Sequence, residues 1–425
     1  MAHRVEARRA PRSRHALALG DVPPAAPLTV DVLVVGAGPA GATAATLLAR
    51  AGRHVMVVDK AEFPRDKCCG DGLTTLALRE LESLGLRPER VPNWQTVDAA
   101  WLRSPSGREV RLPMPADGIY AATTPRRELD AALVQLARDA GADVREGHAI
   151  DGLRQFSDRA EVDVTGLGTV AAAFVVAADG MWSPTRKLLG LAEPGYLGEW
   201  HAFRQYARNV TGPAAERLYV WFEPDFLPGY AWSFPLPDGR ANIGFGVVRD
   251  GSRTGKAMKA DWAGLIHRPH IRAALGPDVE LEDRHTAWPI PAGIDRAVLT
   301  AGRTLFVGDA ARATDVMTGE GIGQAVLTGR LAAEAIAATD DVNEVRTSYE
   351  QAVHHHLFAD HRMSKVLNRM LAKPLLARGA VRIVGLNDFT RRNFVRWMFE
   401  DEPRAVVLTP RRWHRRFLRQ HGTYR

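Results

Sequence analysis

Continuous apolar runs and amphipathic segments alternate along the first part of the chain. Val30–Asp59 begins with an apolar run to Val35, continues as an Ala/Leu-rich segment to Gly52, and closes on a second apolar run ending at Asp59. Such runs are typical of strands buried on both faces, so this stretch predicts a β-α-β unit. Further strands are expected at 142–146, 169–178 and 304–307, and helices at 74–85, 126–140 and 322–338.

A second pattern, alternating and rich in aromatic residues, extends from about Glu193 to Arg296. It predicts half-buried strands at 200–206, 217–222, 230–235 and 241–248, the last two joined as a hairpin by a turn at Pro237-Asp238-Gly239. Shorter strands are expected at 99–104 and 109–112, and helices from Val342 to about Phe399.

These patterns predict an α/β protein with an inserted antiparallel sheet and a helical C-terminal region. We expect a disordered basic extension at 1–29, a discontinuous nucleotide-binding domain at 30–192 and 297–340, a β-sheet substrate domain at 193–296, and a helical region with a basic tail at 341–425.

Composition and charge indicate the cellular compartment and the kinds of partner. No apolar run is long enough to cross a membrane, and the adjacent Cys68 and Cys69 are poorly suited to a structural disulfide, which favours a cytoplasmic protein. The net charge of +7 is concentrated at the two ends, so a nucleic-acid-binding face is not indicated. The Arg-rich run at 410–419, with Trp413 and Phe417 one helical turn apart, predicts either peripheral contact with the inner face of the membrane or a basic tail packed on the protein.

The β-α-β unit carries a nucleotide-binding motif. Gly36, Gly38 and Gly41 form a GxGxxG, in which the glycines permit a tight turn, a close backbone approach to a pyrophosphate and close packing of helix on strand. Asp59, 18 residues after Gly41, is placed to accept hydrogen bonds from a ribose. Only one such motif occurs, so a nicotinamide reductant would visit transiently or be replaced by another carrier.

Three segments that are far apart in the sequence together resemble a known superfamily. Gly36–Asp59, Asp179–Arg186 and Gly308–Ile322 in combination resemble the flavoprotein superfamily of para-hydroxybenzoate hydroxylase, whose Rossmann-like domain (GR2 type) binds FAD. That resemblance implies that Asp309 holds the ribityl or ribose part of FAD, that Gly319–Ile322 present a helix N-terminus to the flavin, and that Arg126 contacts the cofactor. The FAD-binding residues implied are Gly36, Gly38, Ala40, Gly41, Asp59, Lys60, Cys69, Gly70, Gly72, Arg126, Asp179, Gly308, Asp309, Gly319, Gly321 and Ile322.

Two further motifs resemble the geranylgeranyl reductases. Lys67-Cys-Cys69-Gly-Asp-Gly-Leu73 is similar to their flavin-side loop, and Tyr230-x-Trp232-x-Phe234-Pro235 with a later Gly244-x-Gly246 is similar to their substrate-domain motif. The resemblance implies reduction of isoprenoid C=C bonds on a prenyl diphosphate, a lipid or menaquinone, with reduced FAD as hydride donor and NAD(P)H or another carrier as reductant. Cys69, Tyr230 and Trp232 are the candidate catalytic residues. Core packing explains Tyr230 and Trp232 equally well, and orientation or packing is the more frequent role of a cysteine such as Cys69.

Other functions stay open. Flavin-dependent halogenases carry a related aromatic motif, so a monooxygenase or halogenase acting on a small aromatic or polyketide-like substrate is the alternative, and a non-catalytic flavoprotein is a third. His354, His355 and His356 are adjacent and point in different directions on a helix, so no metal site is expected.

Overall fold

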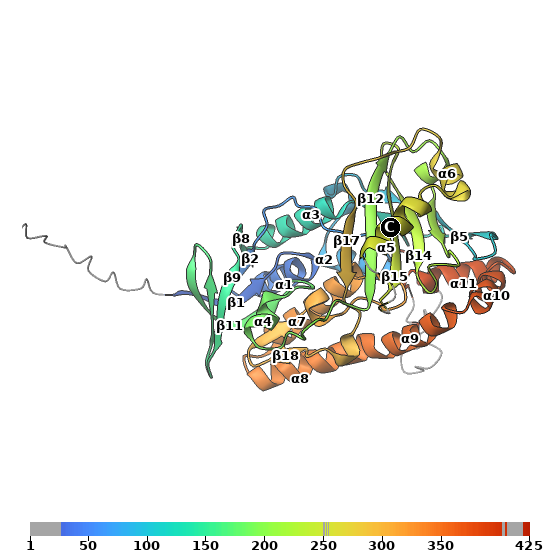
Figure 1. Ribbon diagram of the computed structural model, residues 1–425. Coiled ribbons are helices and arrows are strands. Elements are labelled where there is room, and N and C mark those ends of the chain that lie inside the picture. Colours follow the sequence, from blue (N-terminus) through green and yellow to red (C-terminus); the bar gives the residue numbers. More distant parts are fainter. Residues whose placement is uncertain (1–26, 250, 252, 254, 402–403, 406–419) are drawn as a thin grey trace, which may run out of the picture.

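The computed structural model describes residues 27–249, 251, 253, 255–401, 404–405 and 420–425. Two sheets lie side by side, and the consecutive helices of the C-terminal region lie along both of them (Figure 1). Residues 1–26 of the expected basic extension and the whole Arg-rich run at 410–419 fall outside the described residues. The expected end of the extension at residue 29 is wrong, because β1 already begins at Leu28.

The first sheet is the nucleotide-binding sheet expected from the sequence. Its strand order is β18 (Thr300–Ala301), β19 (Thr304–Phe306), β11 (Gly168–Ala177), β1 (Leu28–Val35), β2 (Val55–Asp59) and β8 (Asp143–Glu146). The four central pairings, from β19 to β8, are parallel, and β9 (Ile150–Gln155) and β10 (Ala160–Val164) extend from β11 as antiparallel strands.

Both faces of this sheet are buried, as the continuous apolar runs predict. Val32 and Val34 of β1 pack toward α1 (Pro39–Arg50), α3 (Arg126–Asp139), α7 (Ile322–Ala338) and α8 (Val342–Val353). Leu33 and Val35 point the other way, against β9 and β10. The alternation follows from the two-residue period of a strand.

The second sheet has the order β16 (Glu280–Leu281), β12 (Trp200–Arg208), β15 (Arg240–Val248), β14 (Tyr230–Leu236), β13 (Leu218–Trp221), β5 (Ala99–Arg103) and β6 (Glu109–Pro113), and β17 (Thr286–Ile290) also pairs with β12. The predicted hairpin is confirmed, since β14 and β15 pair antiparallel with Trp232 opposite Gly244. The structure differs from the sequence interpretation at β5 and β6: both fall within the range given to the nucleotide-binding domain, yet β5 joins the second sheet through a parallel pairing with β13. The domain boundaries themselves stay a prediction.

Helices accompany the second sheet where the sequence pattern predicted only strands. These are α5 (Gly255–Leu265) and α6 (Pro269–Leu275), whose Trp262, Leu265 and Ile271 pack on Phe203 and Phe245 of the sheet. The remaining elements are β3 (Gly72–Leu73), β4 (Gln95–Thr96), β7 (Ala122–Thr123), α2 (Thr75–Leu84), α4 (Pro184–Leu188), a π-helical turn at His354–Phe358, α9 (Ala359–Leu371), α10 (Pro374–Val384) and α11 (Asp388–Met398).

The C-terminal helices run from the first sheet to the second. In Figure 1, α8 and α9 lie along the lower edge of the molecule, and α10 and α11 reach the right-hand end beside β5. None of the helices in the described part of the chain combines the length and the apolar content needed to cross a bilayer.

Candidate active site

The carboxyl ends of four parallel strands meet at one edge of the first sheet. In the observed register Val35 lies opposite both Val58 and Ala177, and Ala177 lies opposite Phe306. The residues that follow these strands therefore converge, which brings the three separated sequence segments together at the position where open α/β sheets bind ligands. A cavity of about 700 Å³ opens there, between the two sheets.

The turn after β1 requires glycine. Gly36 has a φ of +100°, and a Cβ at this position would lie 2.4 Å from the carbonyl oxygen of Ala178. A Cβ on Gly41 would lie 1.8 Å from the carbonyl oxygen of Gly36, so α1 packs against the turn as the motif predicts. Gly38 differs, because its Cβ would meet nothing closer than the Arg65 guanidinium at 3.7 Å, and this position borders the cavity.

The N-terminus of α1 is left open toward the cavity. Gly38, the residue before the helix, provides no side-chain cap, and the first turn contains no acidic residue. Unpaired backbone N–H groups and the positive end of the helix dipole together favour a phosphate group. Asp59 stands at the next strand end, where Oδ2 accepts the Ala37 N–H at 2.7 Å and Oδ1 accepts the Ala61 N–H at 2.9 Å.

Asp179 retains an unused acceptor in the same cavity. Its Oδ2 accepts the Thr185 N–H at 2.8 Å, whereas Oδ1 is buried and has no hydrogen-bond partner among the described residues. Burial raises the pKa of this carboxyl. An orphaned buried acceptor that lines a cavity is satisfied by a ligand with hydroxyl or N–H donors.

Residues of the second sheet hold the loop that contains Cys69. Asn242, fully buried on β15, donates from Nδ2 to the Cys69 carbonyl and to Asp71 Oδ2, both at 2.8 Å, and accepts the Trp232 indole N–H at 3.0 Å. Tyr206 of β12 donates to the same Asp71 oxygen at 2.6 Å. The sequence interpretation missed Asn242 and Tyr206, because only cross-strand register places them beside this loop.

The Cys69 thiol is poorly suited to donate a proton. Its Sγ accepts the Asp71 N–H at 3.4 Å, and burial raises its pKa to about 12. Cys68, which is adjacent and also a free thiol, donates to the Thr286 carbonyl instead. Both thiols border the cavity.

Aromatic side chains of the second sheet form one wall. Tyr230 packs beside Trp200 and Trp232, with ring centroids 6.3 and 6.0 Å apart, and its hydroxyl donates to the Thr318 carbonyl. The Trp200 indole N–H donates to the Val316 carbonyl at 2.7 Å. The wall is thereby fixed to the loop that precedes α7.

Gly70 and Gly72 lie against this aromatic wall. A Cβ on Gly70 would lie 3.3 Å from the Phe234 ring and 3.5 Å from the Trp232 indole, and one on Gly72 would lie 2.9 Å from Phe234. Both glycines also border the cavity. The close contact with Phe234 favours glycine at both positions, and the sequence interpretation did not include this explanation.

Glu320 is a titratable group that the sequence interpretation passed over. It lines the cavity, and its Oε1 accepts the Ile322 N–H at 2.9 Å at the start of α7. Burial raises its pKa to about 7, against the opposing effects of the Ile322 and Gly323 N–H groups and of Arg126. In the structure the Glu320 carboxyl therefore occupies the Ile322 N–H, and the Asp315 carbonyl occupies the Gly319 N–H, two of the backbone N–H groups that were expected to face the flavin.

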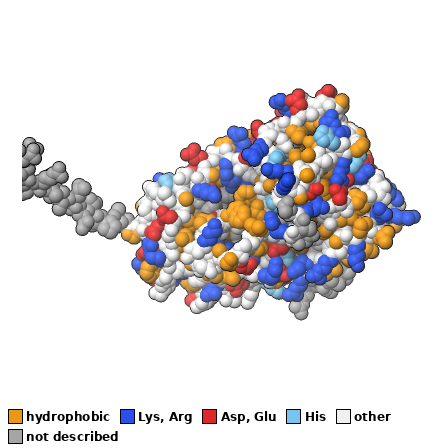
Figure 2. Space-filling view, in the orientation of Figure 1, with side chains coloured by type: hydrophobic (Ala, Val, Ile, Leu, Met, Phe, Trp, Pro, Cys, Tyr) orange, Lys and Arg blue, Asp and Glu red, His pale blue; other side chains and the backbone are white. Residues whose placement is uncertain are grey.

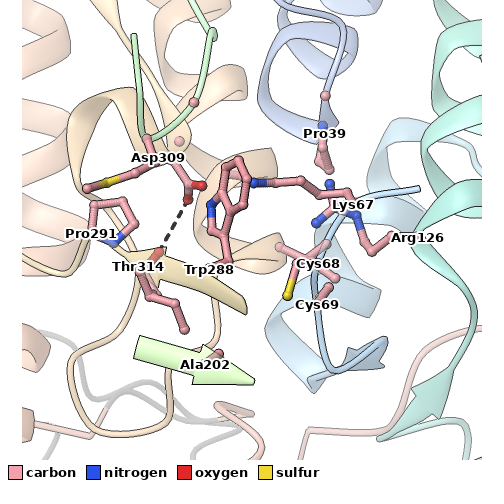
Figure 3. A pocket seen from close by; sticks show the side chains of 18 of the residues that line it. Pro39, Lys67, Cys68, Cys69, Arg126, Ala202, Trp288, Pro291, Asp309 and Thr314 are labelled. Atoms are coloured by element: carbon pink, nitrogen blue, oxygen red, sulfur yellow. Dashed lines mark hydrogen bonds between the residues drawn. The ribbon is translucent and has the colours of Figure 1, made fainter. Parts of the chain in front are cut away.

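Lys67 packs against the ring of Trp288, and both residues line the cavity. The Lys67 ammonium lies 3.6 Å from the centroid of the Trp288 ring, and Figure 3 shows the lysine side chain extended toward the indole, close to Asp309. Burial lowers the pKa of Lys67, and Asp309 opposes that shift. Trp288 lies on β17, whose sequence carried no motif that identified it.

Comparison with known proteins identifies the family. The FAD binding domain family matches residues 29–356. The chain is 32% identical to menaquinone reductase of Mycolicibacterium smegmatis over 81% of this chain and 85% of that protein. It is 31% identical to digeranylgeranylglycerophospholipid reductase 2 of Methanopyrus kandleri over 75% of this chain and 80% of that protein. The chain belongs to the geranylgeranyl reductase family.

Solved structures share the fold of this geranylgeranyl reductase family member. A geranylgeranyl bacteriochlorophyll reductase-like protein of Thermoplasma acidophilum superposes with a TM-score of 0.77 at 24% identity, covering 91% of this chain and 100% of that chain. The halogenase PltM in complex with phloroglucinol and FAD gives a TM-score of 0.67 at 18% identity, covering 89% and 86%. At these identities the likeness shows the fold alone.

The cofactor of this reductase family member is FAD. The site suits it, since the open N-terminus of α1, the unpaired oxygen of Asp179 and the acceptor at Asp59 offer partners for phosphates and hydroxyls. Arg126 borders the cavity with its guanidinium bound to both carboxylate oxygens of Asp130 at 2.8 Å.

Almost all of the residues expected from the sequence line this one cavity. They are Gly36, Gly38, Ala40, Asp59, Lys60, Cys69, Gly70, Gly72, Arg126, Asp179, Tyr230, Trp232, Gly308, Asp309, Gly319, Gly321 and Ile322. Gly41 lies behind the turn and supports the packing of α1. The individual roles assigned to these residues stay predictions.

Proposed function

We propose that this protein is an FAD-dependent reductase that saturates isoprenoid C=C bonds carried on a prenyl diphosphate, a lipid or menaquinone. One observation carries the proposal: the nucleotide-binding edge of the first sheet and an aromatic wall from the second sheet enclose the same cavity. The wall includes Trp200, Tyr230 and Trp232, and an alkene without polar substituents needs such an apolar surface for alignment.

The names of the relatives support this class of substrate. Menaquinone reductase and digeranylgeranylglycerophospholipid reductase are named for prenylated substrates, and each is similar to this chain over about three quarters of its length or more. Both names are compatible with the same step, which adds a hydride and a proton across one C=C bond. The anaerobic experiment described below identifies which molecule carries the isoprenoid.

The roles of the residues follow from their positions. Reduced FAD supplies the hydride when it is bound. The residues around Gly38, Asp59 and Asp179 bind and orient the cofactor, and the aromatic wall excludes water and aligns the substrate chain. The protein must also deliver one proton to the neighbouring carbon, because an isolated alkene has no carbonyl group to accept charge.

Glu320 is the best proton donor for this step. Its pKa of about 7 leaves it substantially protonated near neutral pH, whereas Cys69 holds its proton with a pKa of about 12. A general acid works best when its pKa is close to the working pH. Tyr230 is a weaker candidate, because burial raises its pKa and its hydroxyl is already donated to Thr318.

An anaerobic half-reaction tests the proposal. The FAD-containing protein is reduced with dithionite, geranylgeranyl diphosphate or menaquinone is added, and reoxidation of the flavin is followed together with the mass of the lipid. We expect reoxidation with a gain of two mass units for each bond saturated, and the lipid that reacts identifies the carrier.

The oxygenase interpretation predicts a different result. If the flavin stays reduced with both lipids but reoxidises when O₂ and an aromatic substrate are admitted, with oxygen or halide entering the product, the protein is a monooxygenase or halogenase. Because dithionite replaces the natural reductant, the outcome does not depend on whether that reductant is NAD(P)H or another carrier.

A further inference from the structure

The most exposed large apolar side chains of the described structure gather on its C-terminal helices. Leu375 is 78% exposed, Phe389 67%, Leu386 63% and Ile383 61%. We define the α9–α11 face as these four residues with Val366, Met370 and Leu376, all exposed between residues 366 and 389. No other described segment of this length has so many exposed large apolar side chains.

Helix α10 has apolar residues on two sides, and only one of these sides is buried against the rest of the protein. Ala377, Val381 and Val384 recur at the spacing of one helix face and are buried, the two valines in the cluster around β5 and β6. Leu375 and Ile383 lie two turns apart on the side that faces away from the protein. An outward apolar side on a helix that is already anchored needs a separate explanation.

The α9–α11 face is surrounded by positive charge. Residues 366–392 contain six basic residues and one acid, a net charge of +5. Arg369, Lys373, Arg378 and Arg382 are exposed, and none of the four forms an ion pair with another described residue. In Figure 2, basic and hydrophobic side chains are interspersed at the lower right, over α9 and α10.

We propose that the α9–α11 face docks on an anionic lipid bilayer. Exposed apolar side chains flanked by arginines and lysines match an interface in which the apolar groups enter the headgroup boundary and the cations contact lipid phosphates. A membrane is favoured over a protein partner because the exposed apolar residues and the basic residues are spread along three helices, α9, α10 and α11.

Helix α9 connects the α9–α11 face to the loop that precedes α7. Helix α9 presents its exposed Val366 and Met370 outward, and its other side holds the loop before α7: Asn368 donates to the Val316 carbonyl at 3.2 Å. The docking proposal does not depend on the reaction proposed above, since binding to lipid can be measured without any substrate.

Vesicle cosedimentation with the full FAD-containing chain tests this surface. We expect binding to phosphatidylglycerol–phosphatidylcholine vesicles and little binding to phosphatidylcholine alone. The variants Leu375→Glu/Ile383→Glu and Arg378→Glu/Arg382→Glu should each weaken binding by about tenfold or more. Phe389→Glu should do the same, whereas Phe156→Glu, which alters an exposed phenylalanine on the β9–β10 connection, should have no effect.

Bound FAD, measured by its absorbance, shows that each variant is folded. The proposal is overturned if the wild-type chain ignores anionic vesicles, or if the α9–α11 variants bind as well as Phe156→Glu. It is also overturned if binding appears only after residues 406–419 are deleted, because those residues would then be the occupant of the face. Loss of binding on deletion of 406–419, with the α9–α11 variants unaffected, would assign the membrane contact to the Arg-rich run instead.

Discussion

At the scale of single residues, burial decides the chemistry of the site. Cys69 and Glu320 line the same cavity, and burial raises the pKa of both. The same shift has opposite consequences for proton transfer. A thiol with a pKa of about 12 retains its proton, whereas a carboxyl group with a pKa of about 7 exchanges it near neutral pH.

Glu320→Gln should remove a pH-dependent step from the reaction. A general acid acts in its protonated form, so the rate of flavin reoxidation by the prenyl substrate should be full below pH 7 and fall above it in the wild type. In the variant we expect a rate about 100-fold lower without that decline. Stopped-flow absorbance across the pH range measures both effects.

The amide is a matched replacement, because its carbonyl oxygen can still accept the Ile322 N–H. Cys69→Ala serves as the comparison and should leave the pH profile unchanged. A Glu320→Gln enzyme with the wild-type pH profile, or a larger loss in Cys69→Ala, would refute the assignment of the proton to Glu320.

Asn242 is expected to support both stability and the cofactor loop. Asn242→Ala removes two hydrogen bonds to the Cys69–Asp71 segment and leaves the Trp232 indole N–H without its acceptor. We expect the free energy of unfolding to fall by about 2–4 kcal/mol, since buried polar groups would be left unsatisfied. Urea denaturation with FAD present measures the loss, and the exposed Asn343→Ala should change stability by less than about 0.5 kcal/mol.

At the scale of elements, local patterns predicted the motifs well and the pairing of strands less well. The glycines at 36, 38 and 41 and the 230–248 hairpin are defined by neighbours along the chain, so their sequence was sufficient. The pairing of β5 with β13 joins residues more than a hundred positions apart, and no local pattern specifies which sheet a short strand enters. Glu320 and Asn242 were missed for the same reason, because burial and register arise only from the fold.

Gly38→Ala separates the role of the α1 turn in cofactor binding from its role in folding. The added Cβ would meet no protein atom within 3.5 Å, so the free energy of unfolding without FAD should change by less than about 0.5 kcal/mol. The methyl group would project where the pyrophosphate is expected to approach, and FAD affinity should fall about tenfold or more.

Gly36→Ala provides the contrasting variant. Its Cβ would collide with the Ala178 carbonyl at a φ of +100°, so folding itself should suffer. Fluorescence titration with FAD and chemical denaturation distinguish the two cases. Equal losses of stability in both variants would contradict the assignment of Gly38 to cofactor approach.

At the scale of the whole molecule, buried carboxyl groups link the cavity to the C-terminal helices. Glu400, beyond α11, accepts hydrogen bonds from Gln324 of α7 at 3.2 Å and from Arg404 at 2.9 Å. Burial raises the pKa of Glu400 to about 8, and Glu320 nearby contributes to the shift. The helical region is therefore electrostatically coupled to the site as well as packed against it.

This coupling predicts how stability depends on pH. Glu320 and Glu400 both have an ordinary pKa of 4.5, raised by burial to about 7 and about 8. At these two groups the folded protein holds more protons than the unfolded chain up to about pH 8, so their contribution lowers the free energy of unfolding as pH rises through that range. Below pH 6.5 this trend is opposed by His361, whose pKa burial lowers, so the decline should be clearest between pH 6.5 and 8.

Urea unfolding at a series of pH values, at a fixed excess of FAD, measures this dependence. Glu400→Gln should flatten the decline between pH 7 and 8 while preserving an acceptor for Arg404. The exposed Glu344→Gln, at the start of α8, should leave the slope unchanged. Stability that stays constant or rises over this interval in the wild type would mean that the two carboxyl groups are already ionised in the folded protein, and Glu320 would then be unable to serve as the proton donor.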